Sequence, residues 1–198
     1  MQFMQAKALL VDRDGVINRM VLYGDQYDSP QSQDDVKLVL GIESVISWAN
    51  QRRILVIEIT NQPGVAKGKM TQKTADQIEN RVHKLLLARG AKINKIYICP
   101  HHPKGVVMAL TKECDCRKPK PGLLRQAARE LNIDLTKSVF LGDGAADDQA
   151  GKSVGCFTIL LDHEENEPKK VEEARIVKPH HRVRSLNKVV PILAKYFK

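Results

Sequence analysis

The stretch ALLVDRDG at residues 8–15 decides the fold class, because a short apolar run passes directly into two aspartates and a glycine. Further runs lie at 54–59, interrupted only by Glu58, and at 96–98, 139–141 and 157–161, with a weaker one at 176–177. Short runs without polar alternation are typical of strands buried on both faces. These runs therefore predict the strands of a parallel sheet.

Apolar residues at helical spacing separate the predicted strands. They indicate helices around 42–49, 78–86, 121–131 and 186–197, and Pro191 predicts a kink or a restart in the last of these. Strands that alternate with helices indicate an α/β fold with a doubly wound, Rossmann-like parallel sheet and helices on both faces. We expect residues 1–198 to form a single domain without a large cap. The segment 19–37 is polar and lacks a period, which predicts a long loop.

The composition limits the classes of function. The 198 residues include 32 Lys and Arg against 23 Asp and Glu, a formal net charge of +9. Such an excess suits a protein that binds nucleic acid, an anionic membrane surface or a phosphorylated substrate. No apolar run approaches the roughly 20 residues that span a membrane, and the N-terminal stretch lacks a secretory signal pattern. We therefore expect a cytoplasmic monomer that does not enter a membrane.

Polar clusters follow four of the predicted strands. They begin at Asp12, Thr60, Cys99 and Asp143. Ligands of parallel α/β sheets bind at the carboxyl ends of the strands. The four clusters therefore predict one site at that edge of the sheet.

Asp12 and Asp14 are two residues apart at the end of the first strand, so their carboxylates are predicted to project to the same side. Two neighbouring carboxylates repel unless a cation or a shared proton relieves them. Mg²⁺ suits this site, with Asp143 as a further oxygen ligand. One carboxylate would then serve as nucleophile and the other as general acid and base. The alternative is an aspartate pair that caps a turn at Gly15.

Thr60 and Asn61 offer a hydroxyl and an amide to phosphate oxygens, and Lys118 precedes a predicted helix whose N-terminus would face the same anion. The alternatives are an N-cap or Asx turn for the first pair and a solvated basic loop for the lysine. Asp147 and Asp148 could help to hold the cation or could be first-turn acids of a helix.

The loop 99–116 carries three cysteines and two histidines. Cys99 and His101 are separated from Cys114 and Cys116 by twelve residues, which makes a Cys₃His set for a closed, structural zinc ion. Free reduced cysteines are the alternative, and the residues alone leave His102 as a second candidate for the imidazole ligand. Cys156 is predicted to be a buried apolar residue. The remaining histidines are expected on the surface or on helices: His83, His163, His180 and His181.

These motifs resemble, in order, those of the haloacid-dehalogenase-type phosphatases: DRDG at 12–15, Thr-Asn at 60–61, Lys118 before a helix and GDGAAD at 142–147. Within that superfamily, four longer stretches resemble the D-glycero-D-manno-heptose-1,7-bisphosphate 7-phosphatases. They are DRDGVIN at 12–18, TNQPGVAKGK at 60–69, CPHHPKG at 99–105 and CDCRKPKPG at 114–122.

The resemblance implies a phosphatase of a small phosphorylated sugar. Asp12 would form an aspartyl-phosphate, and Asp14 would protonate the leaving oxygen and then activate water. The resemblance also implies that the Asp12 carboxylate, the Asp14 carbonyl and the Asp143 carboxylate hold Mg²⁺, and it favours His101 as the zinc ligand. The remaining residues would contact substrate: Thr60 and Lys118 the transferring phosphoryl group, Arg117 the second phosphate, and Arg13, Asn61 and Gln62 the rest of the sugar phosphate.

One departure and several alternatives accompany the resemblance. Gly144 follows Asp143 where heptose phosphatases usually have lysine, so a substrate-binding cation is expected to be missing. The alternatives are a histidinol-phosphate phosphatase, a nucleic-acid 3′-phosphatase and a non-enzymatic, zinc-stabilised binder of anions or nucleic acid. The complete motifs, with Asp12, Asp14, Lys118 and Asp143 all present, favour an enzyme over the non-enzymatic binder, and the longer matching stretches favour the sugar phosphate as substrate. The basic segment 178–198 is left unexplained by this interpretation.

Overall fold

A parallel sheet forms the centre of the chain in the computed structural model, which describes residues 5–162 and 168–198. Its strand order is β5-β4-β1-β6-β7-β8, and every pairing is parallel. The chain builds from β1 outward to β5 and then returns to the other side of β1, so the sheet has its switch point between β1 and β6. The predicted doubly wound α/β fold is confirmed. The strands are β1 (Ala8–Val11), β4 (Leu55–Asn61), β5 (Lys95–Cys99), β6 (Val139–Gly142), β7 (Phe157–Leu161) and β8 (His181–Val183).

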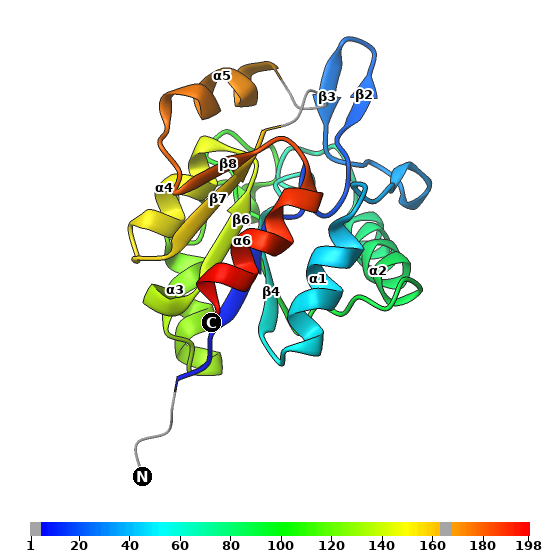
Figure 1. Cartoon of the computed structure of the whole chain (residues 1–198). Helices are drawn as coiled ribbons and strands as arrows, with labels where there is room; N and C mark the ends of the chain where they lie inside the picture. The colour runs from blue at the N-terminus through cyan, green and yellow to red at the C-terminus, as the bar shows by residue number, and fades with distance from the viewer. Residues whose placement is uncertain (1–4, 163–167) are drawn as a thin grey trace.

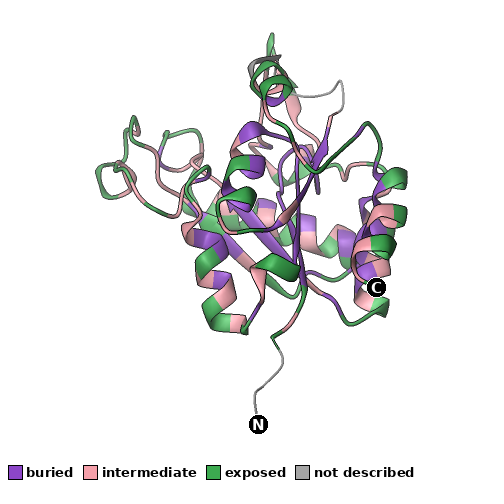
Figure 2. Cartoon of the chain, turned by 60° about the vertical axis from the view of Figure 1, so that its left-hand side comes forward, coloured by how far each residue is buried: buried purple, intermediate pink, exposed green. Residues whose placement is uncertain are grey.

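Helices cover both faces of this sheet (Figure 1). On one face, α1 (Ile42–Gln51), α2 (Gln72–Leu87) and α6 (Val189–Tyr196) pack against Leu9 and Val11 of β1. On the other face, α3 (Gly122–Leu131) and α4 (Ala145–Lys152) belong to the core that contains Ala8 and Leu10. Figure 2 shows the buried strands between helices whose outer sides are exposed. The alternation along β1 thus divides the hydrophobic core between two layers.

The segment 19–37 corrects the prediction of an irregular loop. It forms an antiparallel hairpin of β2 (Val21–Tyr23) and β3 (Gln26–Asp28), followed by the short 3₁₀ helix η1 (Gln33–Asp35). Three-residue strands are too short to show a period, which is why the sequence did not predict them. Figure 1 shows the hairpin and α5 (Pro168–Ile176) at the end of the sheet where the parallel strands finish. No larger insertion covers this end within the described residues, in agreement with the absence of a large cap.

Two further expectations concern the C-terminus: the predicted strand at 176–177 was wrong, and of the two outcomes predicted for Pro191 the restart is confirmed. The run at 176–177 is not a strand, because Ile176 ends α5, and the last strand of the sheet is β8 instead. Pro191 lies in the first turn of α6, directly after the 3₁₀ helix η4 (Leu186–Lys188), so it marks the start of a helix and not a kink. None of the described helices is long and apolar enough to cross a membrane. His163 lies outside the described residues.

Candidate active site

Three of the four strand-end clusters meet in a cleft of about 250 Å³ at the carboxyl edge of the sheet, whereas the cluster that begins at Cys99 does not line it. The predicted residues that line it come from β1, β4, the loop before α3 and the start of α4. They are Asp12, Asp14, Thr60, Asn61, Arg117, Lys118 and Asp147, and Lys170 of α5 also lines the cleft.

Asp12 and Asp14 both line the cleft although each residue is only 7% exposed. Gly15 has a φ of 90°, a left-handed conformation that suits glycine and turns the chain after the second aspartate. The Asp12 Oδ1 atom accepts a hydrogen bond of 2.8 Å from the Arg13 backbone amide and lies 2.7 Å from the Lys118 ammonium. The orientation of the Asp12 carboxylate is therefore set by the protein before any ligand binds.

Asp12, Asp143 and Asp147 form a buried carboxylate cluster in which one oxygen of each lies within 4.8 Å of the others. Burial raises the pKa of Asp12, helped by the charge of Asp147, and it raises the pKa of Asp143 to about 7. The Asp143 Oδ2 atom is buried and accepts no hydrogen bond from any described residue. Crowded carboxylate oxygens with an unused acceptor are the donor set that a hard divalent cation prefers. The carboxylate cluster therefore fits a metal ion.

The carboxylate of Asp147 is held mainly by contacts within the protein. Its Oδ2 atom accepts backbone hydrogen bonds of 3.0 Å from Gly144 and 3.3 Å from Asp143, and its Oδ1 atom lies 2.7 Å from the Lys118 ammonium. Asp148 points elsewhere, because it accepts a hydrogen bond from Thr158 and pairs with Lys152. Asp148 is therefore not an alternative donor to the metal site.

Lys118 is 4% exposed and bridges the carboxylate cluster. In addition to its two aspartate contacts, its ammonium donates a 2.8 Å hydrogen bond to the Ile59 carbonyl oxygen. Asn61 holds the Lys118 backbone on both sides: its Oδ1 atom accepts from the Lys118 amide at 3.0 Å, and its Nδ2 atom donates to the Lys118 carbonyl at 3.1 Å. Asn61 thus positions the lysine as well as lining the cleft.

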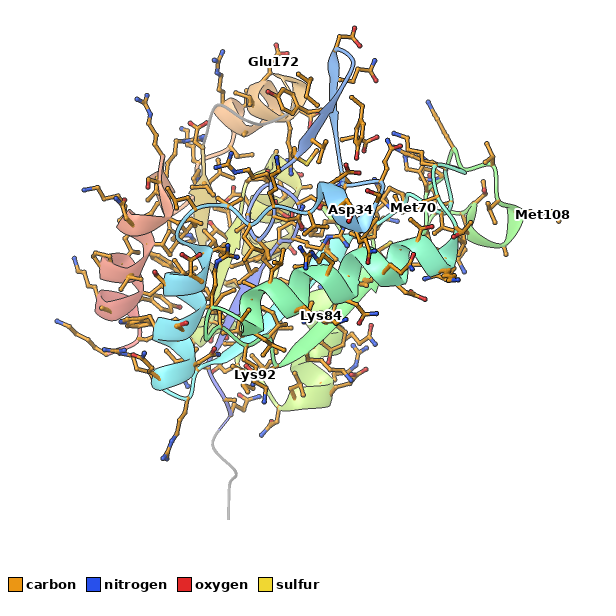
Figure 3. The ribbon with its side chains drawn as sticks, turned by 90° about the vertical axis from the view of Figure 1, so that its right-hand side faces the viewer. Asp34, Met70, Lys84, Lys92, Met108 and Glu172 are labelled. Carbon is orange, nitrogen blue, oxygen red and sulfur yellow. The ribbon has the colours of Figure 1, made fainter. Side chains whose placement is uncertain are left out.

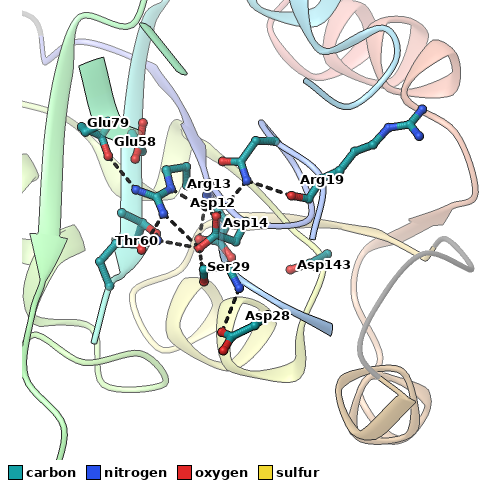
Figure 4. A network of polar contacts seen from close by, with 12 residues as sticks. Asp12, Arg13, Asp14, Arg19, Asp28, Ser29, Glu58, Thr60, Glu79 and Asp143 are labelled. Carbon is teal, nitrogen blue, oxygen red and sulfur yellow. Dashed lines mark hydrogen bonds and ion pairs between the residues drawn. The ribbon is translucent and has the colours of Figure 1, made fainter. Parts of the chain in front are cut away.

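Asp14 lies in a dense set of donors (Figure 4). Arg13 approaches both carboxylate oxygens at 3.2 and 3.3 Å, Gln62 donates at 2.7 Å, Ser29 at 2.7 Å and Asn18 at 2.9 Å. Burial alone would raise the pKa of Asp14, but the charge of Arg13 and these hydrogen bonds outweigh it and hold the pKa at about 2. Asp14 is therefore ionised, as a general base requires.

Arg13, expected to contact substrate, is only 3% exposed. Its guanidinium also pairs with Glu79 at 2.9 Å and donates to Gln62 at 2.5 Å, and it lines a separate cavity of about 70 Å³ beside α2. Gln62 donates in turn to the Thr60 hydroxyl at 2.8 Å. These contacts place Arg13 behind Asp14 and outside the residues that line the cleft, so its predicted contact with substrate stays a prediction.

The contacts of Arg13 continue into α2 and β4. His83 lies 2.9 Å from Glu79 and 3.3 Å from Glu58, whose side chain is fully buried. Burial and the charge of Glu79 raise the pKa of Glu58 to about 7, and the two glutamates raise the pKa of His83 to about 9 against the effect of its burial. We call Arg13, Glu58, Glu79 and His83 the arginine network. His83 lies on a helix, as expected, but its ion pairs were not predicted. Glu58, a charged residue inside an apolar run, was the sequence feature that could have indicated a buried partner.

The four residues of the predicted Cys₃His set lie together. The Sγ atoms of Cys99, Cys114 and Cys116 are 3.1–3.5 Å apart, and the His101 Nδ1 atom lies 3.3 Å from Cys116 and 3.9 Å from Cys99. Ligands bound at about 2.3 Å around one tetrahedral ion would be separated by a little under 4 Å. The donor set and its spacing therefore fit a closed metal centre, and His102, whose Nδ1 atom accepts from the Lys104 amide, is not part of it.

Known proteins show the same motifs and the same fold. A family model described as HAD-hydrolase-like matches residues 115–189. A D-glycero-alpha-D-manno-heptose-1,7-bisphosphate 7-phosphatase of Photorhabdus laumondii is 34% identical over 85% of this chain and 90% of its own length. A D-glycero-beta-D-manno-heptose-1,7-bisphosphate 7-phosphatase of the same organism is 40% identical over 78% of this chain and 79% of its own length. The chain belongs to this phosphatase family.

A solved structure of the same family supports the assignment. It is the D,D-heptose 1,7-bisphosphate phosphatase of B. bronchiseptica in complex with magnesium and phosphate, which superimposes with a TM-score of 0.79 at 29% identity. The match covers 96% of this chain and 98% of that one. The fold of this chain is therefore that of a heptose bisphosphate phosphatase.

Two side chains of this family member were missed by the sequence analysis. Ser29, directly after the hairpin, donates to Asp14, and the neighbouring Asp28 is held by an ion pair with Lys69 from the loop after β4. Lys170 of α5 lies 2.5 Å from Asp143 and supplies a cation on the side where Gly144 had predicted none. Neither residue belongs to a motif, because each is brought to the cleft by tertiary structure.

Proposed function

We propose that this chain is a Mg²⁺-dependent phosphatase that removes the 7-phosphate of D-glycero-D-manno-heptose 1,7-bisphosphate. The observation that carries the proposal is the pairing of an oriented Asp12 with a separately held Asp14 in one cleft. The substrates named for the curated relatives support the sugar bisphosphate.

In the proposed reaction, an Asp12 carboxylate oxygen bonds to phosphorus while the bond from phosphorus to the sugar oxygen breaks. Asp14 gives a proton to that leaving oxygen and, in the second step, takes one from the water that cleaves the aspartyl-phosphate to inorganic phosphate. The dianionic phosphoryl group would raise the pKa of Asp14 when it enters, because like charges disfavour ionisation, so that Asp14 takes up a proton from solvent before it acts as the acid. Lys118 and Thr60 stabilise the charge on the transferring oxygens.

The residues proposed to hold Mg²⁺ are Asp12 and Asp143 through carboxylate oxygens and Asp14 through its carbonyl oxygen. Bound there, Mg²⁺ would offset the negative charge of the carboxylate cluster and of the phosphoryl group that approaches it. We propose that Zn²⁺ holds Cys99, His101, Cys114 and Cys116. These ligands end one residue before Arg117, which lines the cleft and donates to the His101 carbonyl at 3.2 Å, so the loop fixes the cation proposed for the second phosphate.

A substrate panel tests the proposal. Purified protein with Mg²⁺ is expected to release phosphate from both anomers of heptose 1,7-bisphosphate faster than from histidinol phosphate or a 3′-phosphorylated oligonucleotide. Asp12→Asn is expected to lower kcat by at least about 10⁴-fold, because an amide is no nucleophile. Faster hydrolysis of histidinol phosphate would overturn the substrate and keep the mechanism, whereas an active Asp12→Asn variant would overturn the mechanism.

We also propose that the chain acts as one domain, as a monomer and in the cytoplasm. Light scattering at several protein concentrations and fractionation of cells that express the protein test these points. A concentration-dependent mass or a membrane-bound fraction would contradict them.

A further inference from the structure

Lys170 reaches the carboxylate cluster from α5, far along the chain. Its ammonium lies 2.5 Å from Asp143 Oδ1 and 4.0 Å from Asp12 Oδ2, and it donates a 3.2 Å hydrogen bond to the Asp14 carbonyl oxygen. These three groups are the ones proposed above to hold Mg²⁺. One ammonium therefore contacts the whole proposed ligand set.

Gly144 is what allows Lys170 to take this path. A Cβ atom at Gly144 would lie 2.9 Å from the Lys170 Cε atom and 3.5 Å from its Cγ atom. The aliphatic part of Lys170 thus runs directly over the glycine, and any side chain at residue 144 would push it aside. The observed position of the Lys170 side chain therefore depends on a glycine at residue 144.

Mg²⁺ and an ammonium cannot share these oxygens, because two cations at such short range repel strongly in a poorly solvated site. When the metal binds, the Lys170 ammonium must leave, but α5 keeps it at the cleft, which Lys170 lines together with Arg117 and Lys118. The side chain is 23% exposed and lines the cleft, so the movement that the proposal requires is a rotation about its own bonds. A phosphate of a substrate bound in that cleft is then an anion within its reach.

We propose that Lys170 is a substrate-binding residue, which occupies the oxygens of Asp12, Asp14 and Asp143 until Mg²⁺ takes them and then binds a substrate phosphate. This inference rests on the proposed Mg²⁺-dependent phosphatase activity. It assigns to α5 the cation that Gly144 had indicated as missing. Loss of Lys170 should raise KM more than it lowers kcat, because the residue binds the phosphate and does not react.

The test compares Lys170→Met with Arg175→Met, an exposed cation on the same helix. Calorimetry with MgCl₂ alone is expected to show tighter Mg²⁺ binding in Lys170→Met, because the competing ammonium is gone. With saturating Mg²⁺, inorganic phosphate is expected to bind Lys170→Met about tenfold more weakly, the size of one charge-assisted hydrogen bond. KM for the bisphosphate should rise by a similar factor.

A second pair of variants tests the path over the glycine. Gly144→Ala keeps Lys170 but displaces it, so it should shift both affinities in the same direction as Lys170→Met. In the double variant G144K/K170M, a lysine that starts beneath the former path of Lys170 should restore phosphate affinity. Because neither binding measurement uses the sugar, failure of the substrate panel would leave this result intact.

Two outcomes would overturn the proposal. One is a phosphate affinity in Lys170→Met equal to that in Arg175→Met. The other is an unchanged Mg²⁺ affinity in Lys170→Met, since the ammonium would then not compete for the oxygens.

Discussion

On one side of the cleft, Asp12 shares its surroundings with Asp143 and Asp147, and two lysines offset the three carboxylates. On the other side, two residues later in the chain, Asp14 is joined to Glu79 and Glu58 through two cations, Arg13 and His83. Both groups of described residues thus combine three carboxylates with two cations. They differ in how the remaining negative charge is accommodated.

The difference follows from access to the cleft. The arginine network lies behind the site, where a proton retained by Glu58, with its pKa of about 7, can balance the charge. Asp12 and Asp147 of the carboxylate cluster line the cleft, and the cluster keeps an unused acceptor on Asp143, so a cation from solution can balance it. One side is neutralised within the protein, and the other is left ready for a metal and a substrate.

Lys118→Met removes the ammonium that pairs with Asp12 and Asp147, and it has the largest expected effect. We expect kcat to fall by about 10²–10³-fold, because a preorganised charge at the transferring phosphoryl group is lost. We also expect the free energy of unfolding to fall by roughly 3–5 kcal/mol, since two buried carboxylates lose their partner. Steady-state kinetics and urea unfolding measure the two effects. Lys120→Met, at an exposed lysine two residues later, is the control, and equal losses in both variants would contradict the role of Lys118.

Removal of the metal centre in the loop tests whether the cleft cations depend on it. Cys116→Ser is expected to lose the bound zinc and to lower kcat/KM by roughly 10–100-fold, as when groups that orient a site are removed. Elemental analysis and kinetics on the same preparation check this. Cys156→Ala is the control, because that cysteine is buried and does not belong to the Cys₃His set, and burial raises its pKa to about 12. Normal zinc content in Cys116→Ser would refute the ligand set.

Glu79→Gln changes the arginine network and leaves the residues that line the cleft unchanged. Arg13 loses its second ion partner, so its charge acts more strongly on Asp14 and opposes protonation of the acid. We expect kcat to fall by up to about tenfold, equivalent to 1.4 kcal/mol, with little change in KM. Asp76→Asn, an exposed carboxylate one turn earlier on α2, serves as the control. A larger effect on KM than on kcat would show that Glu79 contacts the substrate.

The pH dependence of stability gives the smallest effect. Glu58 and His83 have raised pKa values in the folded protein, about 7 and about 9, so the folded state binds more protons than the unfolded state. Stability from Glu58 is therefore lost as pH rises from 4.5 to about 7, and stability from His83 as pH rises from 6.5 to about 9. His83→Gln should flatten the decline in unfolding free energy between about pH 7 and 9, whereas the exposed His181→Gln should not. An unchanged slope in His83→Gln would contradict the shift.

The residues that the sequence identified are those whose position follows from local structure. Asp12, Thr60 and Asp143 stand at or just after the ends of buried strands, and Lys118 stands just before a helix. Because parallel strands end at the same edge of a sheet, the residues that follow their ends are expected to lie close together. The position of Cys99 was predictable in the same way, because it stands at the end of β5.

The residues that it missed reach the site by tertiary packing. Lys170 depends on how α5 lies over the end of the sheet, and Ser29 depends on a hairpin too short to show a period. The arginine network was partly accessible, because Glu58 interrupts an apolar strand and a buried carboxylate requires a partner. Which helix would supply that partner could not be deduced without the packing of α2 on β4.

The central place of β1 has a consequence for the order of synthesis. The strand that carries Asp12 is the first of the sheet to leave the ribosome, yet its partner on one side, β6, begins only at Val139. The Lys170 contact to the Asp14 carbonyl spans 156 residues. Non-local pairings of this kind close slowly. A nascent chain must therefore carry Asp12 beside an open sheet edge until β6 has been made, and the contact from Lys170 forms later still.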